Sequence, residues 1–241
     1  MNPPDLLATV PTSSAALVAA AVDAGLEAPV PSCPGWTAEK LVRHTGLVLR
    51  YVGKVVEAGG PIDSQALAKP PPGALVVQWF EEMARISLDA LAAKAPDDEL
   101  WNWAGQPPVA CFWQRRVANE LAVHAADAQL AAGREPQVET ELAADAIDEL
   151  LTVLLPATVE RAGTDLSGIG TLHVHCTDTN GEWLVAAGPA GLAVAREHAK
   201  GDAALRGPAS DVLLRLCNRG GGGEVVGEPS VLTTFTQRFT F

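Results

Sequence analysis

The spacing of apolar residues changes character at "GREPQ", residues 133–137. Before this point Ala, Leu and Val recur at helical intervals over long stretches, whereas residues 170–197 alternate with period two around the hairpin signal "TNGE". Long helical segments followed by short alternating ones are typical of an α+β fold. We therefore predict a helical domain over residues 1–135 and a small α+β domain over residues 136–241.

The first domain has four predicted helices, over about residues 5–26, 38–58, 75–95 and 112–131. Thr37 is a good N-cap for the second helix. The connection "PIDSQALAKPPPGAL" between the second and third helices has fifteen residues, whereas adjacent bundle helices are usually joined by roughly 2–8. The sequence therefore predicts a four-helix bundle with one long crossover connection.

The second domain is predicted to begin with a helix over residues 140–162, which should kink or end near Pro156. Short strands follow, joined by tight turns, and helical spacing returns in "SDVLLRLCNR", residues 210–219. The glycine-rich segment 218–227 lacks the features of a phosphate-binding loop, so a flexible loop is expected there. We predict hairpin strands with helices on one face of the sheet.

The formal net charge of −12 restricts the partners. An acidic chain repels phosphate backbones, and no polybasic segment is present to bind an anionic membrane, so neither nucleic acid nor membrane is expected as a partner. The N-terminus is acidic and interrupted by prolines, and no apolar run approaches the length needed to cross a bilayer. A cytoplasmic protein is the resulting expectation.

Glu120 and His124 lie four residues apart in the fourth predicted helix. Residues at this spacing share one face, separated by about 6 Å along the axis, so both can reach one ion. His44 is the other histidine of this domain and lies on the second helix, which a bundle would bring nearby. The three form a candidate His2Glu metal site, a set that leaves a coordination position open, and Asp127 is placed to hold a ligand imidazole.

Ordinary structural roles compete with this interpretation. A Glu/His pair at this spacing on an Ala-rich helix is more often a solvated face, and Arg116 is equally suited to a surface ion pair with Glu120 or to orienting it. The pair His173 and His175 lies on one face of a predicted strand. With no third ligand nearby in the sequence, a solvated strand face is the favoured reading there.

Several motifs occur in order along most of the chain, namely "VPSCPGWTAEKLVRHTG", "FWQRRVANELAVHAADAQ", "GEWLV" and "LRGPASDVLLRLCNRG". Together they resemble the mycothiol-dependent maleylpyruvate isomerase family. The resemblance implies a DinB-like metal-binding bundle followed by a domain similar to sterol carrier proteins. It also implies that His44, Glu120 and His124 ligate a divalent metal, usually zinc, and that Arg219 helps bind the thiol cofactor mycothiol or a substrate carboxylate.

A thiol-dependent reaction gives the metal a chemical purpose, because only the thiolate is a good nucleophile and a Lewis-acidic ion deprotonates a bound thiol. Thiolate addition to an activated double bond, rotation and elimination would give cis–trans isomerisation, and without elimination the result is S-transfer. A metal-dependent hydrolase and a non-catalytic small-ligand-binding protein are the alternatives. The expected partners are a small electrophile and a low-molecular-weight thiol, with a monomer favoured.

Overall fold

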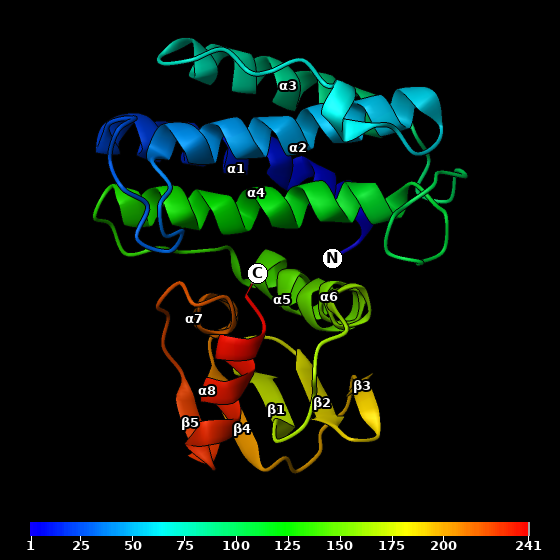
Figure 1. Ribbon diagram of the computed structural model, residues 1–241, viewed down its shortest axis with the longest axis vertical. Coiled ribbons are helices and arrows are strands. Elements are labelled where there is room, and N and C mark those ends of the chain that lie inside the picture. The colour runs from blue at the N-terminus through cyan, green and yellow to red at the C-terminus, as the bar shows by residue number, and fades with distance from the viewer. Residues whose placement is uncertain (241) are drawn as a thin grey trace. The chain divides into compact units, whose positions relative to one another are not determined.

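The computed structural model describes residues 1–240 and divides into two compact units, Met1–Pro136 and Gln137–Phe241. Phe241 itself, the last residue of the predicted second domain, lies outside the described residues. The first unit is helical, and the second combines helices with a five-stranded sheet (Figure 1). The α+β fold class expected from the change in apolar spacing is confirmed.

The first unit is a bundle of four long helices, α1 (Pro3–Ala24), α2 (Ala38–Ala58), α3 (Leu75–Ala92) and α4 (Cys111–Ala131). Helix α1 packs mainly along α4, and α2 packs mainly along α3. The predicted cap of α2 is present, because the Thr37 hydroxyl accepts a hydrogen bond from the Lys40 N–H at 3.3 Å. Helix α4 is buried on several sides, which explains its Ala-rich sequence.

The long connection between α2 and α3 runs back along α2, with one 3-10 turn, η1 (Ser64–Ala66). Three hydrogen bonds mark its path: Ala68 with Arg50, Pro70 with Arg43, and Gly73 with Glu39. These contacts step from the middle of α2 toward its first turn, so α3 begins beside the start of α2 and runs parallel to it. The predicted crossover is therefore confirmed (Figure 1).

Helix α1 corrects one expectation. Among the described residues, Asp5–Ala24 forms a helix that is long and apolar enough to cross a membrane, with a mean hydropathy of 1.5, so the statement that no run approaches this length was wrong. Its apolar side faces the bundle, where Leu6, Val10 and Leu17 are buried. A core helix packed along α4 meets the same criteria of length and composition, so the helix by itself is weak evidence for a membrane span.

The second unit begins with α5 (Thr140–Glu149), a π-helical turn η2 (Leu150–Leu154) and α6 (Leu155–Ala162). In a regular helix the ring of Pro156 would clash with the carbonyl four residues earlier, and Pro156 has no N–H to donate. The wider π turn directly before Pro156 changes that hydrogen-bonding pattern. The disturbance predicted near Pro156 therefore takes the form of a π turn within a nearly continuous helix.

The sheet has the strand order β3-β2-β1-β4-β5, in which β1 and β4 are parallel and the other neighbours are antiparallel. Its strands are β1 (Gly170–Cys176), β2 (Glu182–Gly188), β3 (Gly191–Ala195), β4 (Ala203–Gly207) and β5 (Glu224–Gly227). The first three strands lie within residues 170–197, where the period-two spacing predicted short strands. The expectation of a flexible loop over residues 218–227 was wrong in its last part, which pairs with β4 as β5.

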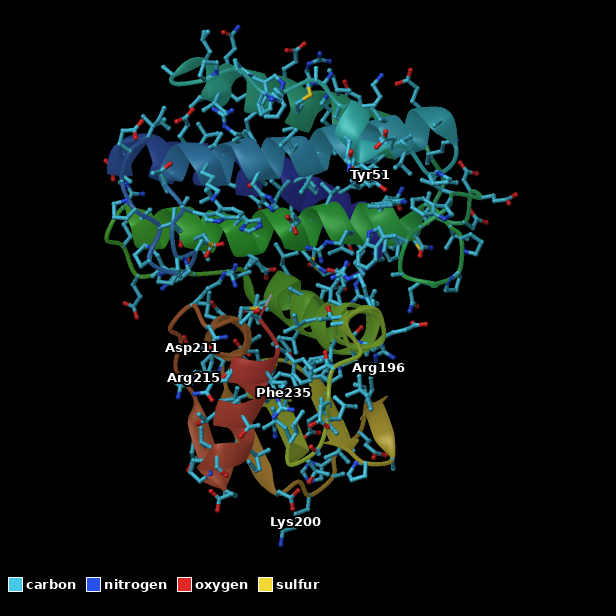
Figure 2. The ribbon with its side chains drawn as sticks, viewed as in Figure 1. Tyr51, Arg196, Lys200, Asp211, Arg215 and Phe235 are labelled. Carbon is cyan, nitrogen blue, oxygen red and sulfur yellow. The ribbon has the colours of Figure 1, made fainter. Side chains whose placement is uncertain are left out.

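Helices α7 (Ala209–Leu216) and α8 (Pro229–Arg238) both pack against β1 and β4. Their side of the sheet is apolar: Leu172 and Val174 are buried, and so is Phe235, which points from α8 toward the strands (Figure 2). Because strand side chains alternate, His173 and His175 lie on the opposite face. Helices on one face were predicted, and this arrangement leaves the histidines of β1 on the other.

Candidate metal centre

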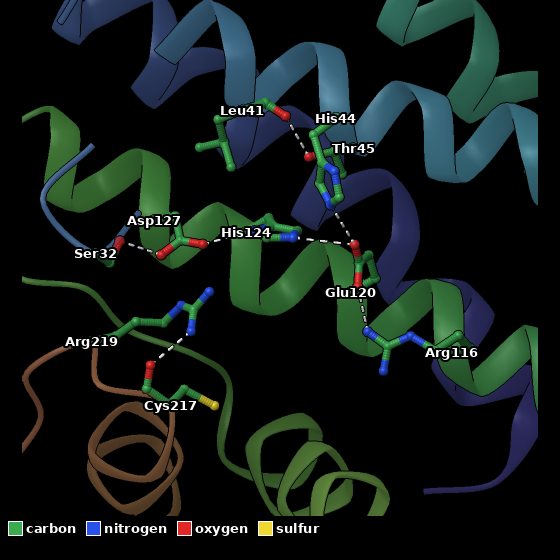
Figure 3. A network of polar contacts seen from close by, with 10 residues as sticks. All are labelled: Ser32, Leu41, His44, Thr45, Arg116, Glu120, His124, Asp127, Cys217 and Arg219. Atoms are coloured by element: carbon green, nitrogen blue, oxygen red, sulfur yellow. Dashed lines mark hydrogen bonds and ion pairs between the residues drawn. The ribbon is translucent and has the colours of Figure 1, made fainter. Parts of the chain in front are cut away.

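Helices α2 and α4 bring the three predicted ligands together (Figure 3). One donor atom from each of His44, Glu120 and His124 lies within 4.8 Å of the other two. The Oε1 atom of Glu120 is 3.2 Å from Nε2 of His124 and 3.4 Å from Nε2 of His44. The helical spacing of Glu120 and His124 thus places them on one side of α4, and packing of α2 supplies the third group.

A hydrogen bond to the carboxylate of Asp127 fixes the orientation of the His124 imidazole. Its Nδ1–H donates to Oδ2 of Asp127 at 2.7 Å, and the other carboxylate oxygen accepts a hydrogen bond from the Ser32 hydroxyl. An ionised carboxylate only accepts hydrogen bonds, so Nδ1 carries a proton and Nε2 is the atom that faces Glu120. Asp127 is fully buried, and through this hydrogen bond it orients the imidazole, as the sequence suggested.

Arg116 lies one turn before Glu120 and binds the carboxylate oxygen that the histidines do not contact. Its Nη2 atom is 2.5 Å from Oε2 of Glu120, and both side chains are largely shielded from solvent. This contact is therefore an internal ion pair rather than an exposed one. It leaves Oε1 of Glu120 directed toward His44 and His124.

The charges of the cluster shift two pKa values in opposite directions. Burial by itself would raise the pKa of Glu120, but the neighbouring His124 and Arg116 hold it well below its usual range. Burial would likewise lower the pKa of His124, yet Glu120 and Asp127 raise it to about 9. Without a metal, a proton on His124 therefore balances the carboxylates, and a divalent cation would take its place.

The composition and spacing of the cluster fit a catalytic zinc site. Two imidazole nitrogens and one carboxylate oxygen are a usual set of three protein ligands for this metal, and such a set leaves a position for a further ligand. The His44 side chain is 41% exposed, which keeps that side of the cluster accessible. The Trp36 ring lies 4.9 Å from the His44 imidazole and forms an aromatic neighbour beside it.

Arg219, the predicted thiol- or substrate-binding residue, belongs to the second unit. It lies three residues after Leu216, the last residue of α7, and its Nη1 atom donates to the Cys217 carbonyl at 2.8 Å. This contact holds the guanidinium close to the end of the helix. Its role in binding a cofactor or substrate stays a prediction.

The second unit also contains a cluster that the sequence interpretation missed. His173 and His175 were assigned to a solvated strand face because no third ligand was evident, but Glu182 and His198 lie beside them. The hairpin register places Glu182 of β2 directly opposite His175, and the loop after β3 supplies His198. The "TNGE" turn was the available signal for Glu182, because the turn fixes which residues face each other.

A four-helix bundle with a His2Glu candidate centre, followed by a small mixed-sheet domain, defines a two-domain α+β protein with a candidate metal site. The family model described as mycothiol maleylpyruvate isomerase N-terminal domain matches residues 7–129, and the model of the C-terminal domain matches residues 141–232. The chain therefore belongs to the mycothiol-dependent maleylpyruvate isomerase family.

Comparison with solved structures agrees with this assignment at the level of the fold. The crystal structure of a mycothiol-dependent maleylpyruvate isomerase superposes with a TM-score of 0.61 at 12% sequence identity, covering 95% of each chain. A histidine-to-alanine mutant of that enzyme gives the same values. A search of curated proteins found no match. At this identity the two structures show a shared fold alone.

Proposed function

We propose that this protein is a divalent-metal-dependent enzyme that uses mycothiol for cis–trans isomerisation of, or S-transfer to, a small electrophile. The observation that carries the proposal is the convergence of His44, Glu120 and His124 within 4.8 Å in a chain of this family. The metal is expected to be zinc. The protein is expected to be cytoplasmic and monomeric, with the bundle over residues 1–135 and the sheet domain over residues 136–241.

A bound divalent cation supplies Lewis acidity, which lowers the pKa of a coordinated thiol and provides a thiolate at neutral pH. The chain's own residues prepare for this chemistry. Asp127 fixes the tautomer of His124, and Arg116 holds one oxygen of Glu120 so that the other faces the histidines. His124 and Glu120 are thereby oriented before any ion binds, which reduces the cost of ordering these two ligands.

Arg219 is the second part of the proposal. A guanidinium is permanently charged and matches the geometry of a carboxylate, so it suits recognition of an anionic substrate. Support comes from the family resemblance and from the hydrogen bond that fixes its side chain near α7. We expect Arg219→Lys to raise KM for an anionic substrate while leaving metal content unchanged.

The first experiment measures zinc per chain by elemental analysis in the wild type and in His44→Ala, Glu120→Gln and His124→Ala. Each variant should contain one zinc fewer per chain than the wild type. Glu57→Gln is the matched control, because Glu57 is an exposed acid on the same helix as His44. Wild-type zinc content in all three variants would remove the metal site from the proposal.

The second experiment tests the thiol. The protein is loaded with Co²⁺ and titrated with mycothiol, and sulfur ligation should produce a near-ultraviolet charge-transfer band that His124→Ala lacks. Turnover of maleylpyruvate, after which the enzyme in the similar crystal structures is named, is then measured with and without the thiol. No band and no thiol dependence of turnover would refute the thiol half, and thiol-independent hydrolysis of an ester or amide would identify a hydrolase instead.

A further inference from the structure

The second unit holds four metal-ligand side chains on the face of the sheet opposite α7 and α8. We name His173, His175, Glu182 and His198 the sheet cluster. One donor atom from each lies within 4.8 Å of the others. The Oε1 atom of Glu182 is the centre of the group, at 2.6 Å from Nδ1 of His198, 3.0 Å from Nδ1 of His175 and 3.3 Å from Nε2 of His173.

Hydrogen bonds within the sheet cluster do not provide a partner for every imidazole nitrogen that faces Glu182. All three imidazoles approach the same carboxylate oxygen, which has only two lone pairs to offer. His173 is 7% exposed, and its Nε2 atom is buried without a hydrogen-bond partner in spite of the 3.3 Å separation from Glu182. A buried polar atom without a partner destabilises the fold, because it has lost its hydrogen bonds to water and gained none in the protein. A cation among the four groups would use this nitrogen as a ligand and remove the penalty.

The loop that carries His198 is fixed at both of its ends. Arg196 donates to Asp148 of α5 at 2.7 Å, and Asp202 accepts from the N–H and hydroxyl of Thr171 at 2.8 and 2.7 Å. Gly201 allows the loop to touch β1, because a Cβ there would lie 2.9 Å from the His173 backbone nitrogen. Lys200, at the tip of the loop, extends away from the sheet (Figure 2). The loop thus holds His198 against the strand histidines.

We propose that the sheet cluster is a second metal site, which binds zinc with four protein ligands and has a structural role. Three imidazoles and one carboxylate are ligands that Zn²⁺ favours. Four ligands at tetrahedral zinc lie roughly 3.3 Å apart for metal–ligand distances of about 2.0–2.1 Å. The separations of His173 and His175 from Glu182 already approach this value, and the exposed His198 is able to move outward.

A site with four protein ligands leaves no position for a substrate, unlike the three-ligand centre of the bundle. The consequence is mechanical: the ion would join β1, β2 and the loop after β3. These segments are otherwise joined by strand pairing and by the loop contacts of Arg196 and Asp202. Zinc binding should therefore raise the stability of the second unit, because binding to the folded state alone stabilises it.

The test uses the full chain carrying His124→Ala, so that zinc at the bundle centre does not contribute. This protein should retain one zinc per chain after equilibration with zinc and gel filtration, and its Tm should fall when EDTA removes the metal. Adding His198→Ala should abolish both the bound zinc and the response to EDTA. The His198 side chain is 79% exposed, so this substitution leaves the core of the unit intact.

Glu197→Gln is the matched control, because Glu197 is the exposed acidic neighbour of His198. In the His124→Ala background it should leave zinc content and the EDTA response unchanged. The proposal is overturned if the His124→Ala protein holds no zinc after loading, or if His198→Ala and Glu197→Gln retain equal amounts. These outcomes are independent of whether the bundle centre binds metal, since that centre has lost a ligand in every protein compared.

Discussion

The substitution Asp127→Asn tests whether Asp127 promotes metal binding by orienting His124, because it leaves His124 itself in place. Asp127 is fully buried and accepts from His124 Nδ1 at 2.7 Å and from the Ser32 hydroxyl. Asparagine has nearly the same shape and still offers one oxygen to Nδ1–H, but the hydrogen bond is no longer charge-assisted. The imidazole therefore becomes a weaker ligand, although the surrounding packing is kept.

The expected loss in zinc affinity at the bundle centre is about 10–100-fold, the usual effect of removing a carboxylate behind a ligand histidine. This range corresponds to about 1.4–2.7 kcal/mol, a size consistent with one charge-assisted hydrogen bond at a buried position. Affinity is measured by competition with a chromophoric chelator, in a His198→Ala background so that only the bundle centre contributes. Asp89→Asn, at an exposed acid paired with Arg85, should stay within twofold of the parent protein.

A second measurement distinguishes orientation from a general loss of structure. In the metal-free protein Asp127 contributes to the raised pKa of His124, so Asp127→Asn should lower this pKa from about 9 toward the ordinary value. The imidazole proton resonances report the titration by NMR. If the variant is folded, its zinc affinity matches that of Asp89→Asn and the pKa of His124 is unchanged, then Asp127 does not act through His124 and the reasoning is refuted.

Three further results are expected. Protonated His124 cannot ligate zinc, and the pKa of His124 in the metal-free protein is about 9. Apparent zinc affinity should therefore rise about tenfold per pH unit up to that pH. An affinity independent of pH between 6 and 8 would contradict this. Burial raises the pKa of Cys176 to about 11, so at pH 8 Ellman's reagent should modify this thiol only after urea unfolding; peptide mapping after labelling locates it. Gly46→Ala should destabilise the bundle by about 1–3 kcal/mol in urea titrations, since its Cβ would overlap the Trp79 ring. Gly53→Ala, on the same helix with ordinary contacts, should be neutral or stabilising by up to about 1 kcal/mol, and equal effects of the two changes would contradict the packing argument.

The bundle was predictable because its signals are local. Thr37 lies directly before an apolar pattern of helical period, and the length of the α2–α3 connection alone excluded a short hairpin between antiparallel neighbours. Glu120 and His124 also share a face of α4 by spacing alone. Only the position of His44 depended on how two helices pack, and the small number of histidines in the domain limited the choice.

The sheet domain was harder to predict because its later strands are short and weakly marked. Strand β4 has five residues, "AALRG", and β5 has four within a glycine-rich run, so neither shows a clear alternation. Helix α8 contains three threonines, one valine and one phenylalanine among its ten residues, and all three residue types have modest helical preference. Each of these elements is defined by its tertiary partner: β4 by parallel pairing with β1, β5 by pairing with β4, and α8 by packing on both.

The two candidate metal sites differ in the same way. The pairing of Glu120 with His124 can be predicted from their four-residue spacing in a helix alone. To predict the sheet cluster, one would need to know the register of one hairpin and the path of a loop across two strands. Period-two spacing aligned His173 with His175, but Glu182 joined them only because the "TNGE" turn sets β2 opposite β1 in that register. His198 follows β3 in the loop that Gly201 allows to press on β1. A solvated strand face was thus the reasonable interpretation of an isolated HxH pair, and the structure changes it by placing two further candidate ligands, Glu182 and His198, beside that strand.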